Sequence, residues 1–217
     1  MTNQPTWDQV TPETLKRALY IDFEGQKDKP PVLLGCATRT GDASAPKPWQ
    51  YVTDLAFEPL AVLGGIEALD LPAAIERILH RAEAKDRQIV AWSERELDVV
   101  RDYCPEFLER FESRYVNART YAVRWRNKCH GGQKPETNRL AAYMALIGHA
   151  VPTVAGPGEV GETLARIRKS LEKGQGVAGL TADQLRRWDV LREHNAHDCV
   201  GMRKVCLLAA EEIAALG

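Results

Sequence analysis

The pattern of apolar residues predicts an α/β fold built on a mixed sheet. Three strand-like runs, 19–24, 31–38 and 49–53, follow one another with turn residues between them, which is typical of an antiparallel meander. Helical and strand-like patterns then alternate, which favours strands joined through helices. Together these observations predict a five-stranded sheet, in which three antiparallel strands are followed by two parallel strands, flanked by helices.

The later elements follow from the same periodicities. A short apolar run at 88–92 predicts the fourth strand, and 114–123 has the pattern of a fifth. Capping-box spacing at Ser93–Glu96 and at Thr181–Gln184 predicts that a helix begins at each. The helix that begins at Thr181 runs towards Leu216, and helices are also predicted at 71–84, 138–147 and 162–171.

Length and composition predict one globular domain spanning residues 1–217. Apolar residues make up 44% and charged residues 27%, and 29 Lys and Arg against 30 Asp and Glu give a net charge of −1, which excludes a globally basic nucleic-acid coat. No run approaches the roughly 18 apolar residues of a membrane span, and the N-terminus lacks a hydrophobic signal core. The five cysteines are odd in number and show no C-x2-C pair, so we expect neither disulfides nor a structural zinc site. Together these observations predict a cytoplasmic protein without membrane partners.

Two acidic residues on the first predicted strand share one face. Asp22 and Glu24 are two positions apart, so their side chains project in the same direction, roughly 6–7 Å apart along the chain, while Leu19, Ile21 and Phe23 point the other way. Two carboxylates beside a core can form a metal site. A strand whose polar face meets water has the same pattern.

The last predicted helix carries a second polar cluster. His194 and Asp198 are spaced i and i+4 and therefore lie on one face, one turn apart. The neighbouring Arg192 and Glu193 show that this part of the helix is generally charged, so a solvated face is the alternative. The choice depends on what else lies near these residues.

These two clusters resemble motifs of a known nuclease family. Tyr20-Ile-Asp22-Phe-Glu24 resembles the first motif of the DEDD exonucleases, which are ribonuclease H-like 3′–5′ nucleases named for four acidic metal ligands. His194-Asn-Ala-His-Asp198 resembles their third motif. In the tyrosine subclass this motif is Y-x3-D, and in a branch of uncharacterised bacterial ribonuclease H-like proteins (YprB-like) it often reads Y-N-x-x-D. The chain matches that spacing, with His194 in place of the tyrosine.

The resemblance spans nearly the whole chain and implies a ribonuclease H-like fold. The segment 138–152 resembles the SLxxLAxxLGIxxP helix common in these nucleases. Their second motif, N-x-x-(F/Y)-D, has two candidates here. Asp98 follows Leu97 but needs a one-residue insertion and lies on a face that looks solvated, whereas Glu96 needs no insertion and lies at the edge of the buried stripe. We favour Glu96, which as a capping-box residue could instead bind the Ser93 amide.

The resemblance implies two-metal chemistry. Clustered carboxylates need cations to stay ionised, and hard oxygen ligands select Mg²⁺ or Mn²⁺, so we expect two Mg²⁺ or Mn²⁺ ions. Asp22, Glu24 and Asp198 would hold them, Glu96 would act through water, and His194 would orient or deprotonate the attacking water. His197 is the alternative base.

A basic stretch between Arg114 and Arg139 suggests a polyanionic substrate. It contains one acid, Glu136, and seven basic residues, which are Arg114, Arg119, Arg124, Arg126, Lys128, Lys134 and Arg139. Aromatic residues lie among these charges, a mixture that can hold single-stranded nucleic acid by phosphate contacts and base stacking. A solvated loop with an inward-packed aromatic is the alternative. The predicted substrate-binding residues are Arg124, Trp125, Arg126 and Lys128.

The sequence therefore predicts a metal-dependent 3′–5′ exonuclease that acts on single-stranded DNA or RNA. The alternative is a catalytically inactive ribonuclease H-like module that binds nucleic acid or a protein partner. This alternative follows from the altered second motif and from His194 at the tyrosine position.

Overall fold

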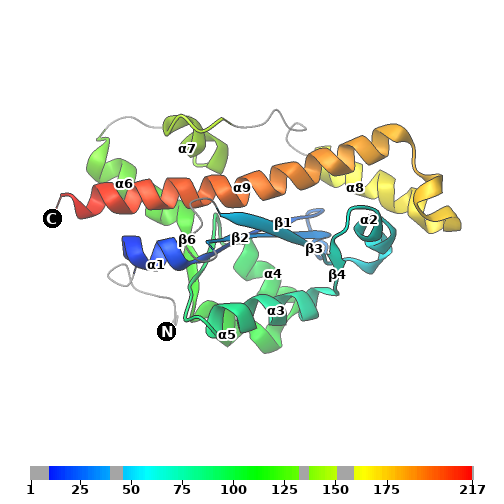
Figure 1. Ribbon diagram of the computed structural model, residues 1–217, viewed down its shortest axis with the longest axis horizontal. Helices are drawn as coiled ribbons and strands as arrows, with labels where there is room; N and C mark the ends of the chain where they lie inside the picture. The colour runs from blue at the N-terminus through cyan, green and yellow to red at the C-terminus, as the bar shows by residue number, and fades with distance from the viewer. Residues whose placement is uncertain (1–9, 40–45, 132–136, 151–158, 217) are drawn as a thin grey trace.

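A six-stranded mixed sheet lies at the centre of the chain (Figure 1). The computed structural model describes residues 10–39, 46–131, 137–150 and 159–216. Across the sheet the strand order is β4-β3-β2-β1-β5-β6. The strands are β1 (Leu19–Glu24), β2 (Leu33–Thr38), β3 (Lys47–Val52), β4 (Glu67–Ala68), β5 (Ile89–Ala91) and β6 (Tyr115–Asn117).

The pairing of the strands confirms the mixed sheet but corrects the strand count. β2 pairs antiparallel with both β1 and β3, β5 pairs parallel with β1, and β6 pairs parallel with β5. The sixth strand, β4, pairs parallel with β3 at Tyr51 and Val52. The sequence did not indicate β4 because a strand of two residues is too short to show a period of two.

The predicted fifth strand at 114–123 is too long. Its strand part ends at Asn117, and the remainder opens helix α6 (Ala118–Cys129). The side chain of Asn117 accepts a hydrogen bond from the Thr120 amide, which caps this helix. Tyr121 and Trp125 are both buried, and their spacing of four positions follows the helix period.

The helices that the apolar spacing predicted are present. Segments 71–84, 138–147 and 162–171 and the last segment correspond to α3, α7, α8 and α9. Besides α6, the α-helices are α1 (Pro12–Arg17), α2 (Glu58–Leu63), α3 (Leu71–Glu83), α4 (Arg95–Tyr103), α5 (Leu108–Glu112), α7 (Leu140–Leu146), α8 (Glu159–Ser170) and α9 (Ala182–Ala214). Shorter helical turns are the 3₁₀ turns Leu55–Phe57, Pro105–Phe107 and Gly176–Gly179 and the π turn Leu171–Gln175.

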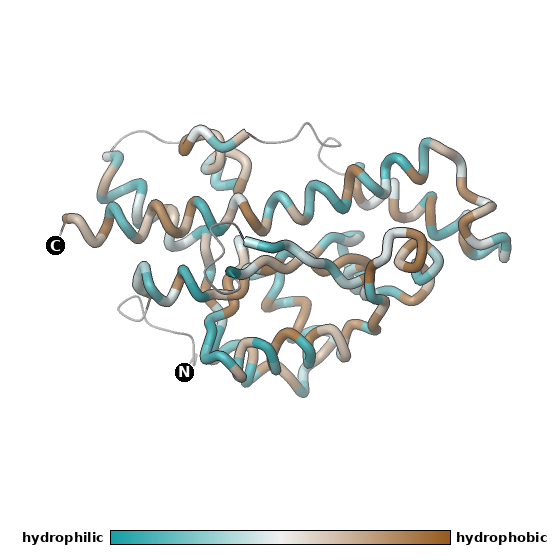
Figure 2. Tube along the Cα trace, in the orientation of Figure 1, coloured by the Kyte–Doolittle hydropathy of each residue, from teal (hydrophilic) through white to brown (hydrophobic). Residues whose placement is uncertain are grey.

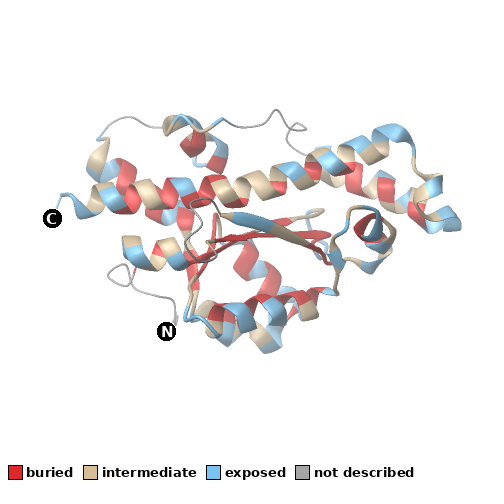
Figure 3. Ribbon diagram, in the orientation of Figure 1, coloured by how far each residue is buried: buried red, intermediate tan, exposed pale blue. Residues whose placement is uncertain are grey.

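The helices cover the two faces of the sheet in separate layers. In Figure 1, α9 runs along the upper face with α6, α7 and α8, while α3, α4 and α5 lie below. Successive residues of β1 point to opposite faces of the sheet. Tyr20 packs in the apolar cluster with α6, α7 and α9, whereas Ile21 and Phe23 pack in the cluster with α3, α4 and α5. The buried surfaces therefore gather along the sheet and on the helix sides that face it (Figure 3).

Helix α9 places a polar segment over the middle of the sheet. Its early residues Trp188 and Leu191 pack in a core cluster with α2 and α8, and its later residues Met202 and Cys206 pack in the cluster with α6 and α7. Residues 192–198 lie between these two apolar contacts and are mostly polar, as the hydropathy colouring along α9 indicates (Figure 2). The ends of α9 thus anchor the helix, and its polar middle crosses β1 and β2.

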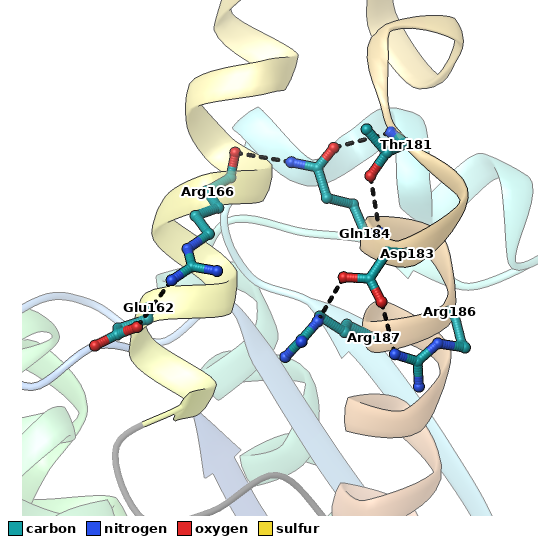
Figure 4. A network of polar contacts seen from close by, with 7 residues as sticks. All are labelled: Glu162, Arg166, Thr181, Asp183, Gln184, Arg186 and Arg187. Carbon is teal, nitrogen blue, oxygen red and sulfur yellow. Dashed lines mark hydrogen bonds and ion pairs between the residues drawn. The ribbon is translucent and has the colours of Figure 1, made fainter.

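The start of α9 is capped and tied to α8. Thr181 and Gln184 form the predicted capping box, because Thr181 Oγ1 accepts from the Gln184 amide at 3.2 Å and Gln184 Oε1 accepts from the Thr181 amide at 2.9 Å (Figure 4). Gln184 Nε2 also donates to the Arg166 carbonyl of α8 at 3.2 Å. Although α9 has 33 residues, no helix in the described segments is long and apolar enough to cross a membrane.

Replacing Thr181 tests this cap. Because Thr181→Ala removes the acceptor for the Gln184 amide, we expect the free energy of unfolding to fall by about 1 kcal/mol. Thr181→Ser keeps the hydroxyl and should stay close to the wild type. Urea unfolding followed by circular dichroism measures both variants. Equal losses in the two variants would show that the hydroxyl cap does not contribute.

Candidate functional site

The polar middle of α9 is hydrogen-bonded to the sheet through Asn195. This side chain is fully buried, and its Nδ2 donates to the Asp22 carbonyl oxygen at 3.0 Å and to Asp22 Oδ2 at 2.8 Å. Its Oδ1 accepts from Gln50 Nε2 at 2.9 Å. Asn195 therefore joins α9 to β1 and β3 at once and fixes one oxygen of the Asp22 carboxylate.

Gly35 provides the space that Asn195 occupies. In the sheet register, Gly35 of β2 pairs with Asp22 on one side and with Gln50 on the other. A Cβ atom at Gly35 would lie 2.1 Å from Asn195 Oδ1, well inside contact distance. The absence of a side chain at Gly35 thus lets α9 approach the sheet closely enough for Asn195 to bridge its two neighbours.

Asp22 interacts electrostatically with three other carboxyl groups. Its charge raises the pKa of Glu24, which is also on β1, of Glu96 in the first turn of α4, and of Asp198 on α9. The four acids therefore converge from three elements that are distant in sequence.

Burial dominates the pKa values of these acids. Desolvation raises the pKa of Asp22 to about 6, although the Asn195 hydrogen bond lowers it in part. Desolvation followed by the charges of Asp22 and Asp198 raises the pKa of Glu24 to about 9. Desolvation and the charge of Asp22 raise the pKa of Glu96 and of Asp198 to about 8 each. The cluster thus disfavours four negative charges unless a cation is near.

The side chains as they lie do not form a ready-made metal cage. Within the described residues, no three His, Cys, Asp or Glu side chains are arranged so as to hold a metal ion. The donor chemistry nevertheless suits a hard cation, because all four acids supply oxygen. Asp198 Oδ1 in particular is buried, and no described part of the chain supplies a hydrogen-bond partner for it.

The second-motif alternatives differ in their surroundings. Glu96 is only 4% exposed, and its Oε2 accepts from Ser93 Oγ at 3.3 Å. Asp98 is exposed and forms an ion pair with Arg101. The predicted capping box at Ser93 is not formed, since α4 begins at Arg95 with Glu94 at the N-cap and no side-chain cap. The Ser93 hydroxyl instead binds the Glu96 carboxylate, so Glu96 faces the acidic cluster and Asp98 faces solvent.

Two histidines flank Asp198. His194 Nε2 lies 3.4 Å from Asp198 Oδ2, and His197 Nδ1 lies 4.0 Å from Asp198 Oδ1. The His197 ring is stacked on His149, with centroids 4.7 Å apart. Burial, and then the charge of His197, lower the pKa of His194, so His194 is neutral at neutral pH. Its buried Nδ1 has no hydrogen-bond partner among the residues that the structure describes.

The predicted substrate-binding residues of α6 separate into two groups. Trp125 is 1% exposed and donates from Nε1 to Glu212 Oε2 of α9 at 2.8 Å. Arg126 is 9% exposed and donates to the Tyr143 hydroxyl of α7 at 3.2 Å. Burial removes these two side chains from the surface that a nucleic-acid strand can contact, so binding roles for Trp125 and Arg126 are not supported. Arg124 is half-buried and Lys128 is exposed.

Other residues of the basic stretch are paired with an acid or lie outside the described residues. Arg114 forms an ion pair with Asp86 at 3.1 Å. Lys134 and Glu136 lie outside the described residues. The stretch is therefore not a continuous basic strip, because one side of helix α6, which includes Trp125 and Arg126, faces the core.

Comparison with known proteins does not place the chain in a family. The sequence matches no known family model, and neither a curated protein nor a solved structure matches it. A function must therefore be inferred from the site.

Sequence reasoning did not identify Gly35, Gln50 or His149 as part of the site. A glycine inside an apolar strand is a signal of close backbone approach, and Gly35 carries it. Gln50 alternates with Trp49 and Tyr51, which places it on the opposite face of β3. The stacking of His149 on His197 has no sequence signal, because it depends on how α7 packs on α9.

The Gly35–Asn195 contact can be tested by a double-mutant cycle. Gly35→Ala should lower the free energy of unfolding by about 1–3 kcal/mol, because the added methyl overlaps Asn195. In the Asn195→Ala background the same substitution should cost less, since the overlapping atoms are gone. Denaturant unfolding of the four proteins gives the coupling energy. A cost that is identical in both backgrounds would contradict the contact.

The raised pKa values predict how the metal-free protein responds to pH. Each acid has a higher pKa in the folded protein than its ordinary value of 3.8 or 4.5, so its stabilising contribution is complete below about pH 4 and is lost as pH rises through about 6 to 9. With EDTA present, the free energy of unfolding should fall over this range.

Variants distinguish the cluster from the rest of the protein. Asp198→Asn and Glu24→Gln should each flatten the pH dependence, because the uncharged amide no longer loses a proton. Asp98→Asn, at an exposed acid, should retain the wild-type profile. Urea unfolding from pH 5 to 9 measures all four proteins. A wild-type profile without a decline would exclude the coupled cluster.

Proposed function

We propose that this protein is a metal-dependent nuclease with a ribonuclease H-like fold, which hydrolyses phosphodiester bonds of single-stranded DNA or RNA from the 3′ end. The observation that carries the proposal is the convergence of four carboxyl groups, Asp22, Glu24, Glu96 and Asp198, whose pKa values are raised by burial and by the charge of one another. Strongly perturbed acids that share one site are candidates for catalysis.

The arrangement of the sheet also supports the proposal. Apart from the two-residue β4, three antiparallel strands are followed by two parallel strands next to β1, as the resemblance to the DEDD exonucleases implies. Asp22 and Glu24 lie on β1 and Asp198 lies on α9, so the acids of the first and third motifs meet across the sheet face. Glu96 adds the second motif from α4.

Metal ions would be held by Asp22, Glu24 and Asp198, with Glu96 acting through water. Bound Mg²⁺ or Mn²⁺ would supply a water of lowered pKa and stabilise negative charge on the phosphate. Asn195 holds Asp22 Oδ2 and so orients the remaining oxygen of that carboxylate. Gln50, by donating to Asn195 Oδ1, fixes which way the Asn195 amide points.

His194 would act as the general base that accepts a proton from the attacking water. As water oxygen bonds to phosphorus, the bond from phosphorus to the 3′ oxygen breaks, the water loses a proton and the leaving oxygen gains one. The Nε2 atom of His194 lies 3.4 Å from Asp198 Oδ2, beside the proposed metal ligands. Burial lowers the pKa of His194, which favours the neutral imidazole that can accept a proton. His197 is held in its stack with His149 and is the less suitable base.

The alternative function is a catalytically inactive module that binds nucleic acid or a protein partner. It is favoured by the lack of a preformed three-ligand group within the described residues and by His194 at the position where the resemblance has tyrosine. The two functions differ in whether metal and the acids matter for turnover, and one assay separates them.

The decisive assay follows 5′-labelled single-stranded RNA and DNA oligonucleotides with Mg²⁺, Mn²⁺ or EDTA. We expect a ladder that shortens from the 3′ end and depends on metal. Asp22→Asn and Asp198→Asn should lower the cleavage rate at least about 100-fold, because each removes charge that neutralises the cations. An unchanged oligonucleotide with either metal would reject the nuclease and favour the inactive module.

A matched pair of substitutions in α4 tests the second-motif assignment. Glu96→Gln and Asp98→Asn each replace one carboxyl group of the same helix with an amide, two residues apart. In the same assay Glu96→Gln should lose at least about tenfold in rate, whereas Asp98→Asn should cleave like the wild type. The reverse result would assign the role to Asp98. Metal-dependent cleavage that survives both changes would remove α4 from the site.

A further inference from the structure

A basic cleft lies at the outer edge of the sheet, beside β3. It has a volume of about 820 Å³, and its walls come from the edge of β3, from the last turns of α3, from the Gly64–Gly65 turn and from α9. Five Lys or Arg side chains line it, which are Lys47, Arg81, Lys85, Arg87 and Arg192. The protein as a whole has a net charge of −1, so this concentration of positive charge is local.

The positive charge of this basic cleft is largely uncompensated. Its one acidic lining residue, Glu67, is already paired with Arg77 at 3.3 Å. Arg192 lies 3.7 Å from Asp189. Within the described segments the other four cations of the cleft form no ion pair with a carboxylate. Unpaired cations that share one concave wall attract a polyanion.

The β3 edge is open where the cations gather. β4 pairs with β3 only at Tyr51 and Val52, so in the described part of the chain residues 47–50 have no strand on their outer side. At about 3.3 Å per residue this open edge runs for roughly 10 Å. Lys47 and Pro48 are exposed there and also block pairing with another strand.

One cation of the cleft is held in place. The Arg81 guanidinium lies over the Trp49 ring, 5.0 Å from its centroid. Stacking on an indole reduces the freedom of a long side chain and leaves the guanidinium donors directed at a ligand. Arg81 is exposed, so the group is both oriented and accessible.

The basic cleft adjoins the acidic cluster through hydrogen bonds. Gln50 and Arg192 line the cleft, and Gln50 Nε2 donates both to the Arg192 carbonyl oxygen at 2.7 Å and to Asn195 Oδ1 at 2.9 Å. Asn195 in turn binds Asp22. Asn195 therefore links Gln50, on the inner wall of the cleft, to the carboxylate of Asp22.

We propose that the basic cleft binds the phosphates of a single-stranded nucleic acid, as a substrate-binding surface outside the acidic cluster. That the bound strand is a substrate rests on the proposed nuclease function. The binding of the strand by the cleft does not. The cleft supplies what the basic stretch on α6 does not, because Trp125 and Arg126 of that stretch are buried. Guanidinium and ammonium groups on one open edge suit a phosphate backbone and require no particular base sequence.

Binding without turnover tests the proposal. The affinity of a fluorescein-labelled single-stranded 12-mer, in DNA and RNA versions, is measured by fluorescence anisotropy with EDTA at 0.1 M salt. The triple variant Lys47→Gln, Arg81→Gln, Lys85→Gln removes three exposed charges of the cleft. It should bind at least about tenfold more weakly, and its slope of log affinity against log salt should be smaller by about 2.

Two controls make the result specific. The charge-keeping double variant Lys47→Arg, Lys85→Arg should bind within about twofold of the wild type, since phosphate attraction depends mainly on charge. Lys169→Gln, Lys173→Gln, Arg186→Gln removes three charges from exposed residues outside the cleft and should also bind like the wild type. Circular dichroism verifies that each variant is folded.

The possible outcomes separate this proposal from the nuclease proposal. Wild-type affinity in the cleft variant, or an equal loss in the Lys169 control, would overturn the basic cleft as the binding site. Displacement of the 12-mer by an equimolar mononucleotide would also overturn it, in favour of a small-phosphate site. If the cleft variant loses binding but the wild type cleaves neither RNA nor DNA, the cleft proposal holds and the nuclease proposal fails.

Discussion

The contact between Asn195 and Gly35 is the constraint on which the rest of the site depends. Gly35 leaves room on the sheet, and Asn195 fills it with an amide that bonds Asp22 on one side and Gln50 on the other. A buried amide must satisfy its donors and acceptor, so the hydrogen bonds of Asn195 help to fix the position of α9 on the sheet. That position brings Asp198, one turn further along α9, to the acids of β1.

The same constraint explains how charged groups come to lie inside the fold. Apolar residues anchor both ends of α9, around Trp188 and around Met202, and the stability that they contribute offsets the burial of polar groups between them. The carboxyls in that interval have raised pKa values because the sheet and α9 exclude water from them. In such a region four ionised carboxylates are more stable with a cation bound than without one. The packing of α9 is thereby connected to the proposed chemistry.

Much of the fold could be predicted from local patterns. The alternation in β1, the helical spacing of α3 and the capping box of Thr181 depend on residues a few positions apart, and each prediction is confirmed. The errors arose where local pattern was ambiguous or too short. Residues 118–123 include Thr120, Tyr121 and Val123, which are residue types common in strands, but the Asn117 cap and the burial of Trp125 against α9 favour a helix. Strand β4 is too short to have a pattern.

For the candidate site, the sequence by itself determined the residue types and their spacing: Asp22 and Glu24 on one strand face, and His194 and Asp198 one helical turn apart. Tertiary structure alone decided which of these groups influence one another. It turned Trp125 inward, stacked His197 on His149, and gathered the cations beside β3 from three elements. The physical reason is that strand and helix periods fix the direction of a side chain locally, whereas burial and electrostatic coupling depend on the elements that pack against it.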